Sequence, residues 1–202
     1  GTGAEISVLD AGHKNIKVFT PTGTFIRTFP DPSDEDVIIK APSDISFDIT
    51  GAIYLADAMG PPVQKFSPEG DLVAKWAGNS VLPGEFDWPE GICFDNDGFI
   101  YIADTNNHRI QKFNSEMQQV DQWYRSGGEI PVDWFPKEIA FFPEDIGAGI
   151  APGILVAGDN CVQVFDLSGN KRYEFTGLAD PYGVAVDADH YIYIADTHNH
   201  RI

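Results

Sequence analysis

A carboxylate, an imidazole and a guanidinium occur close together in YIADTNNHRIQKF (101–113), as Asp104, His108 and Arg109. Such a set is suited to general acid–base chemistry or to holding an anion. The same pattern returns in YIADTHNHRI (193–202) and decays elsewhere in the chain. Because the pattern recurs, we interpret it as structural: the Asp caps a turn through backbone N–H groups and pairs with the Arg across a hairpin.

The repetition extends well beyond this string. Four columns of residues keep a spacing of 47 residues: Asp10, Asp57 and Asp104; Phe19, Phe66 and Phe113; Phe29, Trp76 and Trp123; Pro42, Pro89 and Pro136. The following unit is irregular, since Pro136 and Pro181 are 45 residues apart. A period in the range of about 40–50 residues indicates a repeat fold. The residues that we assign to the structural repeat motif are Asp10, Asp57, Asp104, Arg109, Asp196 and Arg201.

Each unit divides into four short runs separated by turn residues. In the third copy these runs are GICFD, FIYIAD, RIQKF and QQVDQWY, and the turns between them are rich in Asn, Asp and Gly. In FIYIAD both alternating faces are apolar, with Ile100 and Ile102 on one side and Tyr101 and Ala103 on the other. A sheet covered on both faces fits a radial stack, so the sequence predicts an all-β fold, a β-propeller with four-stranded antiparallel blades.

At this level of detail the sequence resembles a known family. PEGICFDNDGFIYIADTNNHRIQKF and PYGVAVDADHYIYIADTHNHRI are similar to the NHL repeat. The second unit departs from the pattern, with Pro61 and Pro62 in place of the His-Arg pair, and the fourth unit carries Asn160 and Cys161 there. The resemblance implies an NHL-type propeller, a ring that is usually six-bladed, and a role as a recognition platform.

We expect one propeller region over residues 1–202, with about four blades present. Naming the strands of a blade a to d from the inside outward, the expected segments are a partial blade with strands b–d (1–30), three blades (41–77, 88–125 and 135–177) and a partial blade with strands a and b (180–202). If the first and last segments formed one composite blade, strand b would be present twice, so the chain has one strand too many to close as a four-bladed ring. We therefore expect the chain to be part of a longer six-bladed ring, continuous with further blades or domains of a larger protein.

The first residues of the innermost strands are the most informative for function, because they open onto one face of the central channel. Ser43, Glu90, Lys137 and Tyr182 follow the recurring Pro, and Asp44, Gly91, Glu138 and Gly183 come next. These residues differ from blade to blade, as residues facing a common ligand do. The resulting candidates for partner binding are Ser43, Asp44, Glu90, Lys137, Glu138 and Tyr182.

Two enzymatic functions are alternatives to binding. Peptide-amidating lyases resemble NHL propellers and place zinc-binding histidines after this Pro; this chain has none there, which argues against that activity. Propeller lactonases and related hydrolases hold a divalent cation in the tunnel, and Asp44, Glu90 and Glu138 offer oxygen ligands suited to calcium. We expect no catalytic residue, no metal and no cofactor, and keep a divalent-metal-dependent hydrolase or lactonase as the alternative.

Composition narrows the partner classes. The chain has 31 acidic and 13 basic residues for a net charge of -18, so its field repels nucleic acid and anionic lipid surfaces. We expect no membrane insertion, since no apolar stretch has the length of a membrane span. The sequence does not identify a compartment; a secreted or cell-surface location is favoured. The predicted function is a non-enzymatic interaction or scaffold module for a protein or glycan partner, anchored by exposed aromatic residues including Trp88 and Trp134.

Overall fold

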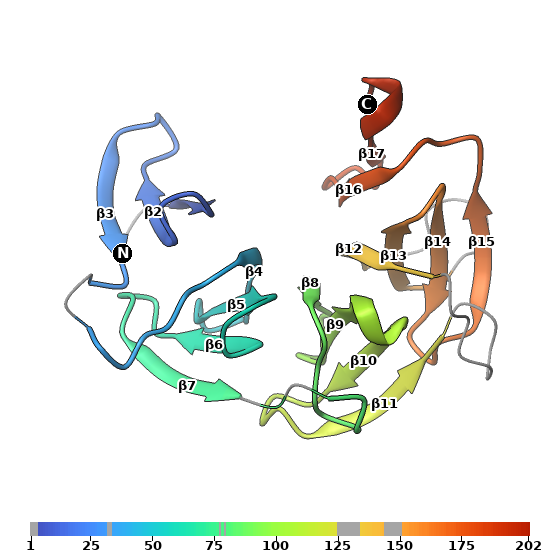
Figure 1. Cartoon of the computed structure of the whole chain (residues 1–202). Helices are drawn as coiled ribbons and strands as arrows, with labels where there is room; N and C mark the ends of the chain where they lie inside the picture. The colour runs from blue at the N-terminus through green and yellow to red at the C-terminus, as the bar shows by residue number, and fades with distance from the viewer. Residues whose placement is uncertain (1–3, 32–33, 77, 79, 125–133, 144–150) are drawn as a thin grey trace.

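The computed structural model describes residues 4–31, 34–76, 78, 80–124, 134–143 and 151–202. Within them the chain forms five antiparallel sheets that follow one another in sequence order and lie side by side along an arc (Figure 1). The first sheet contains β1 (Ile6–Asp10), β2 (Asn15–Phe19) and β3 (Phe25–Phe29). The last contains β16 (Pro181–Val186) and β17 (Ile192–Asp196).

The three sheets between them have four strands each, in sequence order from the inside of the arc outward. The second sheet contains β4 (Pro42–Phe47), β5 (Ile53–Asp57), β6 (Val63–Phe66) and β7 (Leu72–Trp76). The third contains β8 (Pro89–Phe94), β9 (Ile100–Asp104), β10 (Arg109–Phe113) and β11 (Gln119–Trp123). The fourth contains β12 (Pro136–Phe142), β13 (Gly153–Gly158), β14 (Cys161–Asp166) and β15 (Lys171–Phe175).

Helical structure in the described residues is limited to two single turns, η1 (Thr105–Asn107) and η2 (Thr197–Asn199). They follow β9 and β17 directly. Among the residues described, no helix is long and apolar enough to cross a membrane. The all-β prediction with four-stranded blades, about four in number, is confirmed, whereas the six-bladed ring stays a prediction.

The cores lie between neighbouring sheets. From β9, Ile100 and Ile102 pack into the cluster shared with the second sheet, whereas Tyr101 and Ala103 pack into the cluster shared with the fourth. All five residues of β9 are buried, as the alternating apolar faces of FIYIAD predict. Each sheet therefore needs a neighbour on both sides to bury its apolar residues.

Aromatic side chains pack between successive sheets. Trp123 at the outer edge of the third sheet lies 6.3 Å from the ring of Phe165 in the fourth. Gly169, in the turn between β14 and β15, has a φ of +78°, and a Cβ there would lie only 2.7 Å from the Trp123 ring. Gly is therefore required both for the left-handed turn and for the close approach of the indole.

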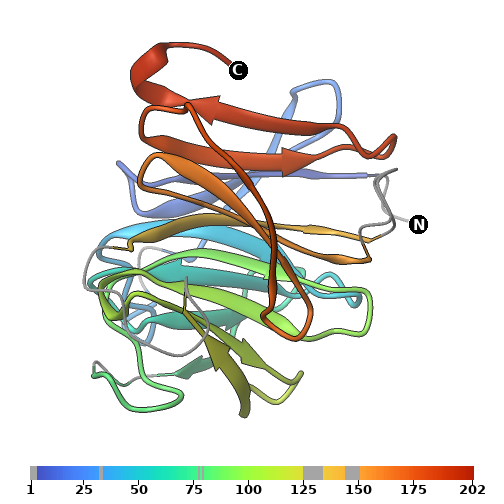
Figure 2. The ribbon, with the colours of Figure 1, turned by 90° about the vertical axis from the view of Figure 1, so that its right-hand side faces the viewer.

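The innermost strands β4, β8, β12 and β16 contact one another in series and line the inside of the arc. Figure 2 shows the same sheets from the side, with the strands of successive sheets stacked in layers. All four strands begin with a Pro, Pro42, Pro89, Pro136 and Pro181, which pairs with the last residue of the second strand of its sheet. We call the end of the molecule that carries these four residues the Pro face.

Candidate functional site

The Asp at the end of the second strand fixes the segment that leads into the innermost strand. Asp104 is fully buried and its Oδ1 accepts a hydrogen bond from the backbone N–H of Asp87 (2.8 Å). Its Oδ2 accepts from Arg109 Nε (2.7 Å), and the side chains of Asn107 and Gln111 also donate to the carboxylate. Arg109 donates further to the backbone carbonyls of Val81, Leu82 and Glu85.

Equivalent residues play the same part in other sheets. Asp57 accepts hydrogen bonds from the backbone N–H groups of Lys40 (2.7 Å) and Ala41 (2.9 Å), and Asp196 accepts one from Ala179 (2.6 Å). Arg201 pairs with Asp196, as Arg109 does with Asp104. Asp10 accepts from the backbone N–H of His13 and from Lys17. Asp57, Asp104 and Asp196 therefore position residues just before the Pro, whereas the hydrogen bonds of Asp10 lie within its own hairpin.

After the Pro, each innermost strand has an irregular register, which displaces the next one or two residues from the ladder. In β4 the displaced Ser43 and its ladder-paired neighbour Asp44 join two sheets. Ser43 Oγ donates to the backbone carbonyl of Pro89 (2.8 Å), and Asp44 Oδ2 accepts from the backbone N–H of Ile92 (2.8 Å). A Cβ at Gly91 would lie 2.5 Å from the carbonyl of Lys137, so β8 and β12 approach closely there.

Three carboxyl groups on the innermost strands of three sheets interact electrostatically. Burial raises the pKa of Asp44 to about 6, against two backbone hydrogen bonds that lower it. Burial, followed by the charges of Asp44 and Glu90, raises the pKa of Glu138 to about 9. Glu138 therefore keeps its proton to a higher pH than a solvent-exposed carboxyl group does.

Glu90 lies at the centre of a group drawn from three consecutive sheets. Burial raises its pKa, while the charge of Lys137 and hydrogen bonds from the side chains of Trp88 and Tyr182 oppose that shift. Lys137 Nζ pairs with Asp180 Oδ1 and lies 5.1 Å from the centroid of the Tyr182 ring. We call Glu90, Lys137, Asp180 and Tyr182 the axial cluster.

Three aromatic residues accompany this cluster on the Pro face, and we call them the aromatic rim: Trp88, Phe135 and Tyr182. Their exposed fractions are 40%, 39% and 49%. Trp88 and Asp180, each directly before the Pro of its strand, have positive φ values of 56° and 49°. A bulky side chain such as that of Trp88 is uncommon in this conformation, and such strained residues concentrate at functional sites.

The expectation that Trp134 is an exposed anchor is wrong. Its side chain is fully buried in the cluster between the third and fourth sheets, 6.0 Å from the ring of Phe165. Its neighbour Phe135 carries the exposed surface instead and packs edge-on against His108 at 4.7 Å. The sequence does not reveal which of two adjacent aromatic residues turns inward.

Besides Phe135, sequence reasoning missed two polar residues of the site. Asp180 occupies the column before the repeated Pro, where the other sheets have Ala41, Trp88 and Phe135. His198 Nε2 lies 3.7 Å from Asp180 Oδ2. The residue before the Pro varies from sheet to sheet, and this variation could have indicated Asp180. His198 lies within the repeated string, which we interpreted as structural.

The arrangement of the His, Cys, Asp and Glu side chains bears on metal binding. The described residues contain no group of three or more His, Cys, Asp or Glu side chains placed to hold a metal ion. Asp95, at the start of the turn DNDG (95–98), caps its own turn by accepting from the backbone N–H groups of Asp97 and Phe99. It also accepts from the hydroxyl of Tyr101 (2.7 Å). Its carboxylate is therefore used within the hairpin.

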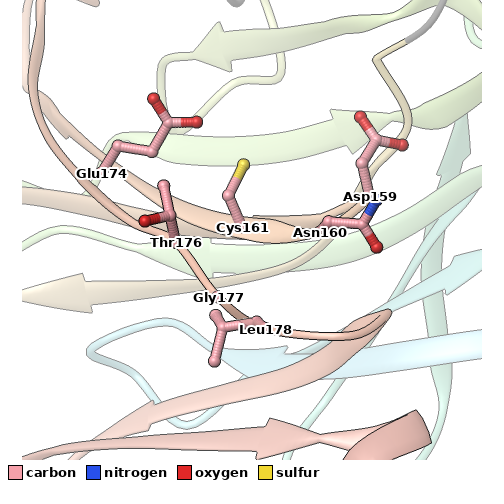
Figure 3. Close-up of a pocket in the computed structure, with 7 residues that line it drawn as sticks. All are labelled: Asp159, Asn160, Cys161, Glu174, Thr176, Gly177 and Leu178. Atoms are coloured by element: carbon pink, nitrogen blue, oxygen red, sulfur yellow. The ribbon is translucent and has the colours of Figure 1, made fainter.

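A separate pocket of about 550 Å³ lies beside the turn between β13 and β14, where Cys161 stands in the place of the repeat Arg (Figure 3). Its lining includes Asp159, Asn160 and Glu174. The Lys171 ammonium, followed by the Cys161 thiol, lowers the pKa of Glu174 to about 2. This pocket lies in a different part of the fourth sheet from the axial cluster.

Two segments of the chain are similar to a known repeat family. The NHL repeat model matches residues 86–113 and 178–202. A search of curated protein sequences found no match.

Solved structures share the fold at low sequence identity. A catalytically inactive virginiamycin B lyase from Staphylococcus aureus with quinupristin is 14% identical, with a TM-score of 0.71, covering 98% of this chain and 61% of that one. A streptogramin B lyase is 15% identical, with a TM-score of 0.67, covering 96% and 59%. A protein of unknown function from Bacteroides caccae is 14% identical, with a TM-score of 0.61, covering 91% and 64%. The chain thus spans less than two thirds of the length of these proteins. The chain therefore contains two segments that match the NHL repeat and has a β-propeller fold.

Proposed function

We propose that the chain is a non-enzymatic interaction module that binds a protein partner on the Pro face. The observation that carries this proposal is the convergence of Glu90, Lys137 and Tyr182, from three consecutive sheets, beside aromatic side chains that stay partly exposed. Partly exposed Trp and Tyr side chains supply large contact areas at a small cost in conformational entropy.

The surrounding structure supports recognition because it holds these groups rigidly. Asp104 and Asp196 fix the links that precede β8 and β16, and the innermost strands contact one another in series. A binding surface with little freedom before association loses less entropy on association. The side chains themselves vary from sheet to sheet, whereas the residues that fix the backbone recur.

Peptide and glycan arrays test this proposal. The labelled wild-type chain is compared with a variant that combines Glu90→Ala, Lys137→Ala and Tyr182→Ala, and with the control Glu116→Ala, whose exposed side chain lies in a turn on the opposite end of the third sheet. We expect a set of peptide signals that the triple variant loses and the control keeps, with unchanged circular dichroism. Peptide signals that survive in the triple variant contradict the proposal. Signals confined to glycans would show that the partner is a glycan and not a protein.

An enzymatic function is the second candidate, because two of the structures that share the fold are named as lyases. At this sequence identity the likeness shows the fold alone. The relevant residues of this chain are Asp44, Glu90 and Glu138, whose pKa values are raised by burial and mutual charge. Elemental analysis of the purified chain decides: a stoichiometric divalent ion that is lost in Glu90→Gln favours the metal-dependent alternative over the interaction module.

A further inference from the structure

The axial cluster already binds an ammonium group, that of Lys137. Its Nζ pairs with the Asp180 carboxylate and lies over the ring of Tyr182, and the Glu90 carboxylate contributes its charge. A carboxylate on one side and an aromatic face on another form a recurrent arrangement for recognising ammonium and guanidinium groups.

We propose that the partner presents a Lys or Arg side chain from a basic peptide segment, and that this side chain enters the axial cluster in place of the Lys137 ammonium. The proposal rests on the Pro-face function above and names its ligand class. Lys137 is then an internal competitor that occupies the cluster until the partner displaces it.

Charge complementarity favours a cationic ligand. The chain carries a net charge of -18, and the axial cluster contributes two carboxyl groups against one ammonium. The side chains of Trp88 and Tyr182 interact with the Glu90 carboxylate, but its buried Oε2 atom has no hydrogen-bond partner in the described part of the chain. A buried acceptor without a donor is costly, and an incoming N–H group would relieve that cost.

The aromatic rim fits the same ligand. Trp88 and Tyr182 both approach the Glu90 carboxylate with hydrogen-bond donors and keep 40% and 49% of their surface exposed. Their rings can cover the aliphatic stem of a Lys or Arg side chain and face its charge. An acidic peptide would instead meet Glu90 and Asp180 as like charges.

The test uses three fluorescein-labelled peptides, acetylated and amidated at their ends: Gly-Lys-Gly-Lys-Gly, Gly-Gln-Gly-Gln-Gly and Gly-Glu-Gly-Glu-Gly. Fluorescence anisotropy at pH 7.5 measures their affinity for the wild-type chain and for Glu90→Gln, Lys137→Met, Tyr182→Ala and Glu116→Gln. The last variant removes one negative charge from an exposed turn away from the Pro face and controls for general attraction to an acidic protein. Thermal unfolding followed by circular dichroism checks that each variant folds.

We expect the Lys peptide to bind the wild type most tightly, with affinity weakened about tenfold or more in Glu90→Gln and unchanged in Glu116→Gln. Lys137→Met is expected to bind the Lys peptide at least about threefold more tightly, because the competitor is gone. Equal weakening in Glu90→Gln and Glu116→Gln, or weaker binding in Lys137→Met, overturns the inference.

The outcomes also separate this inference from the Pro-face function. If the Gln or Glu peptide binds best and Tyr182→Ala weakens it, the Pro face still binds a partner and only the cationic ligand class is wrong. If the Lys peptide binds and no axial substitution changes its affinity, the cationic inference is wrong at this site. If the array signals also survive the triple substitution, the Pro-face function is wrong as well.

Discussion

Two copies of one sequence occupy different surroundings in this chain. IYIAD is followed by η1 and Arg109 in one copy and by η2 and Arg201 in the other. Their local geometry is nearly identical, since His108 and His200 have φ values of 56° and 54° and both Asp carboxylates pair with the Arg Nε atom. The turn and the ion pair are therefore encoded within the string itself.

Burial distinguishes the two copies. The side chain of Arg109 is 3% exposed and that of Arg201 is 60% exposed. Tyr101 is fully buried, whereas Tyr193 keeps 48% of its surface. In the first copy, carbonyl groups of Val81, Leu82 and Glu85 surround the guanidinium. The comparison shows that the string determines the shape of the hairpin, while the neighbouring segments determine how much that shape stabilises the fold.

The largest expected contrast is between the two arginines. Arg109→Ala is expected to lower the free energy of unfolding by about 3–5 kcal/mol, because it leaves the buried Asp104 carboxylate without its cation. Arg201→Ala is expected to cost about 1 kcal/mol or less, since the side chain is solvent-exposed. Urea denaturation measures both. Equal losses would show that the surroundings do not determine the strength of the pair.

A core substitution gives a second contrast. Ile102→Ala removes a fully buried side chain between the second and third sheets and is expected to cost about 2–5 kcal/mol. Ile194→Ala, at the matching position of the second copy, removes a partly buried side chain and is expected to cost about 1–2 kcal/mol. The same denaturation experiment compares them, and a larger loss for Ile194→Ala would contradict the assignment of the cores.

The pH dependence of the free energy of unfolding reports on the innermost strands β4 and β12, which lie outside both copies of the string. Because the pKa of Glu138 is raised from 4.5 to about 9, the folded chain holds a proton that the unfolded chain has lost between those values. Stability from this group is therefore full below pH 4.5 and is lost as pH rises toward 9. Asp44 acts in the same direction between 3.8 and about 6.

Glu138→Gln cannot titrate, so we expect it to gain about 1–3 kcal/mol relative to the wild type between pH 5 and pH 8.5. Thermal and urea unfolding at the two pH values measure the difference. The control Glu116→Gln is expected to show no such change. If the free energies of unfolding of the wild type and Glu138→Gln differ by the same amount at both pH values, the Glu138 carboxyl group is not buried as described.

The smallest contrast concerns the two left-handed histidines. His108 Nδ1 is 2.7 Å from the carbonyl oxygen of Trp134, and the ring packs against Phe135. His108→Gly is expected to cost about 1–2 kcal/mol because these contacts are lost. His200→Gly is expected to stay within about 0.5 kcal/mol of the wild type, since glycine tolerates the positive φ. Equal effects would mean that the ring contacts of His108 contribute nothing.

Much of the fold could be predicted from the sequence because its signals are local and repeated. The 47-residue spacing of Asp10, Asp57 and Asp104 reveals the unit, and the alternating apolar faces of FIYIAD indicate a sheet that is covered twice. These features depend on residues within one unit.

The site was less accessible to sequence reasoning because it depends on contacts between units. Neither the burial of Trp134 nor the pairing of Lys137 with Asp180 follows from a single repeat. The positive φ values of Trp88 and Asp180 carry no Gly or Asn signal. Their conformations arise from the links that Asp104 and Asp196 hold in place.

Hydrogen–deuterium exchange of the backbone amides tests the central claim most directly. Residues 101–110 and 193–202 differ at one position, so their intrinsic exchange rates are nearly the same and any difference in protection reports the surroundings. We predict that the amides of Ile102 and Ala103 exchange at least about a hundredfold more slowly than those of Ile194 and Ala195. Equal protection of the two strings would contradict the conclusion that neighbouring sheets, and not the repeat sequence alone, supply the stability of each unit.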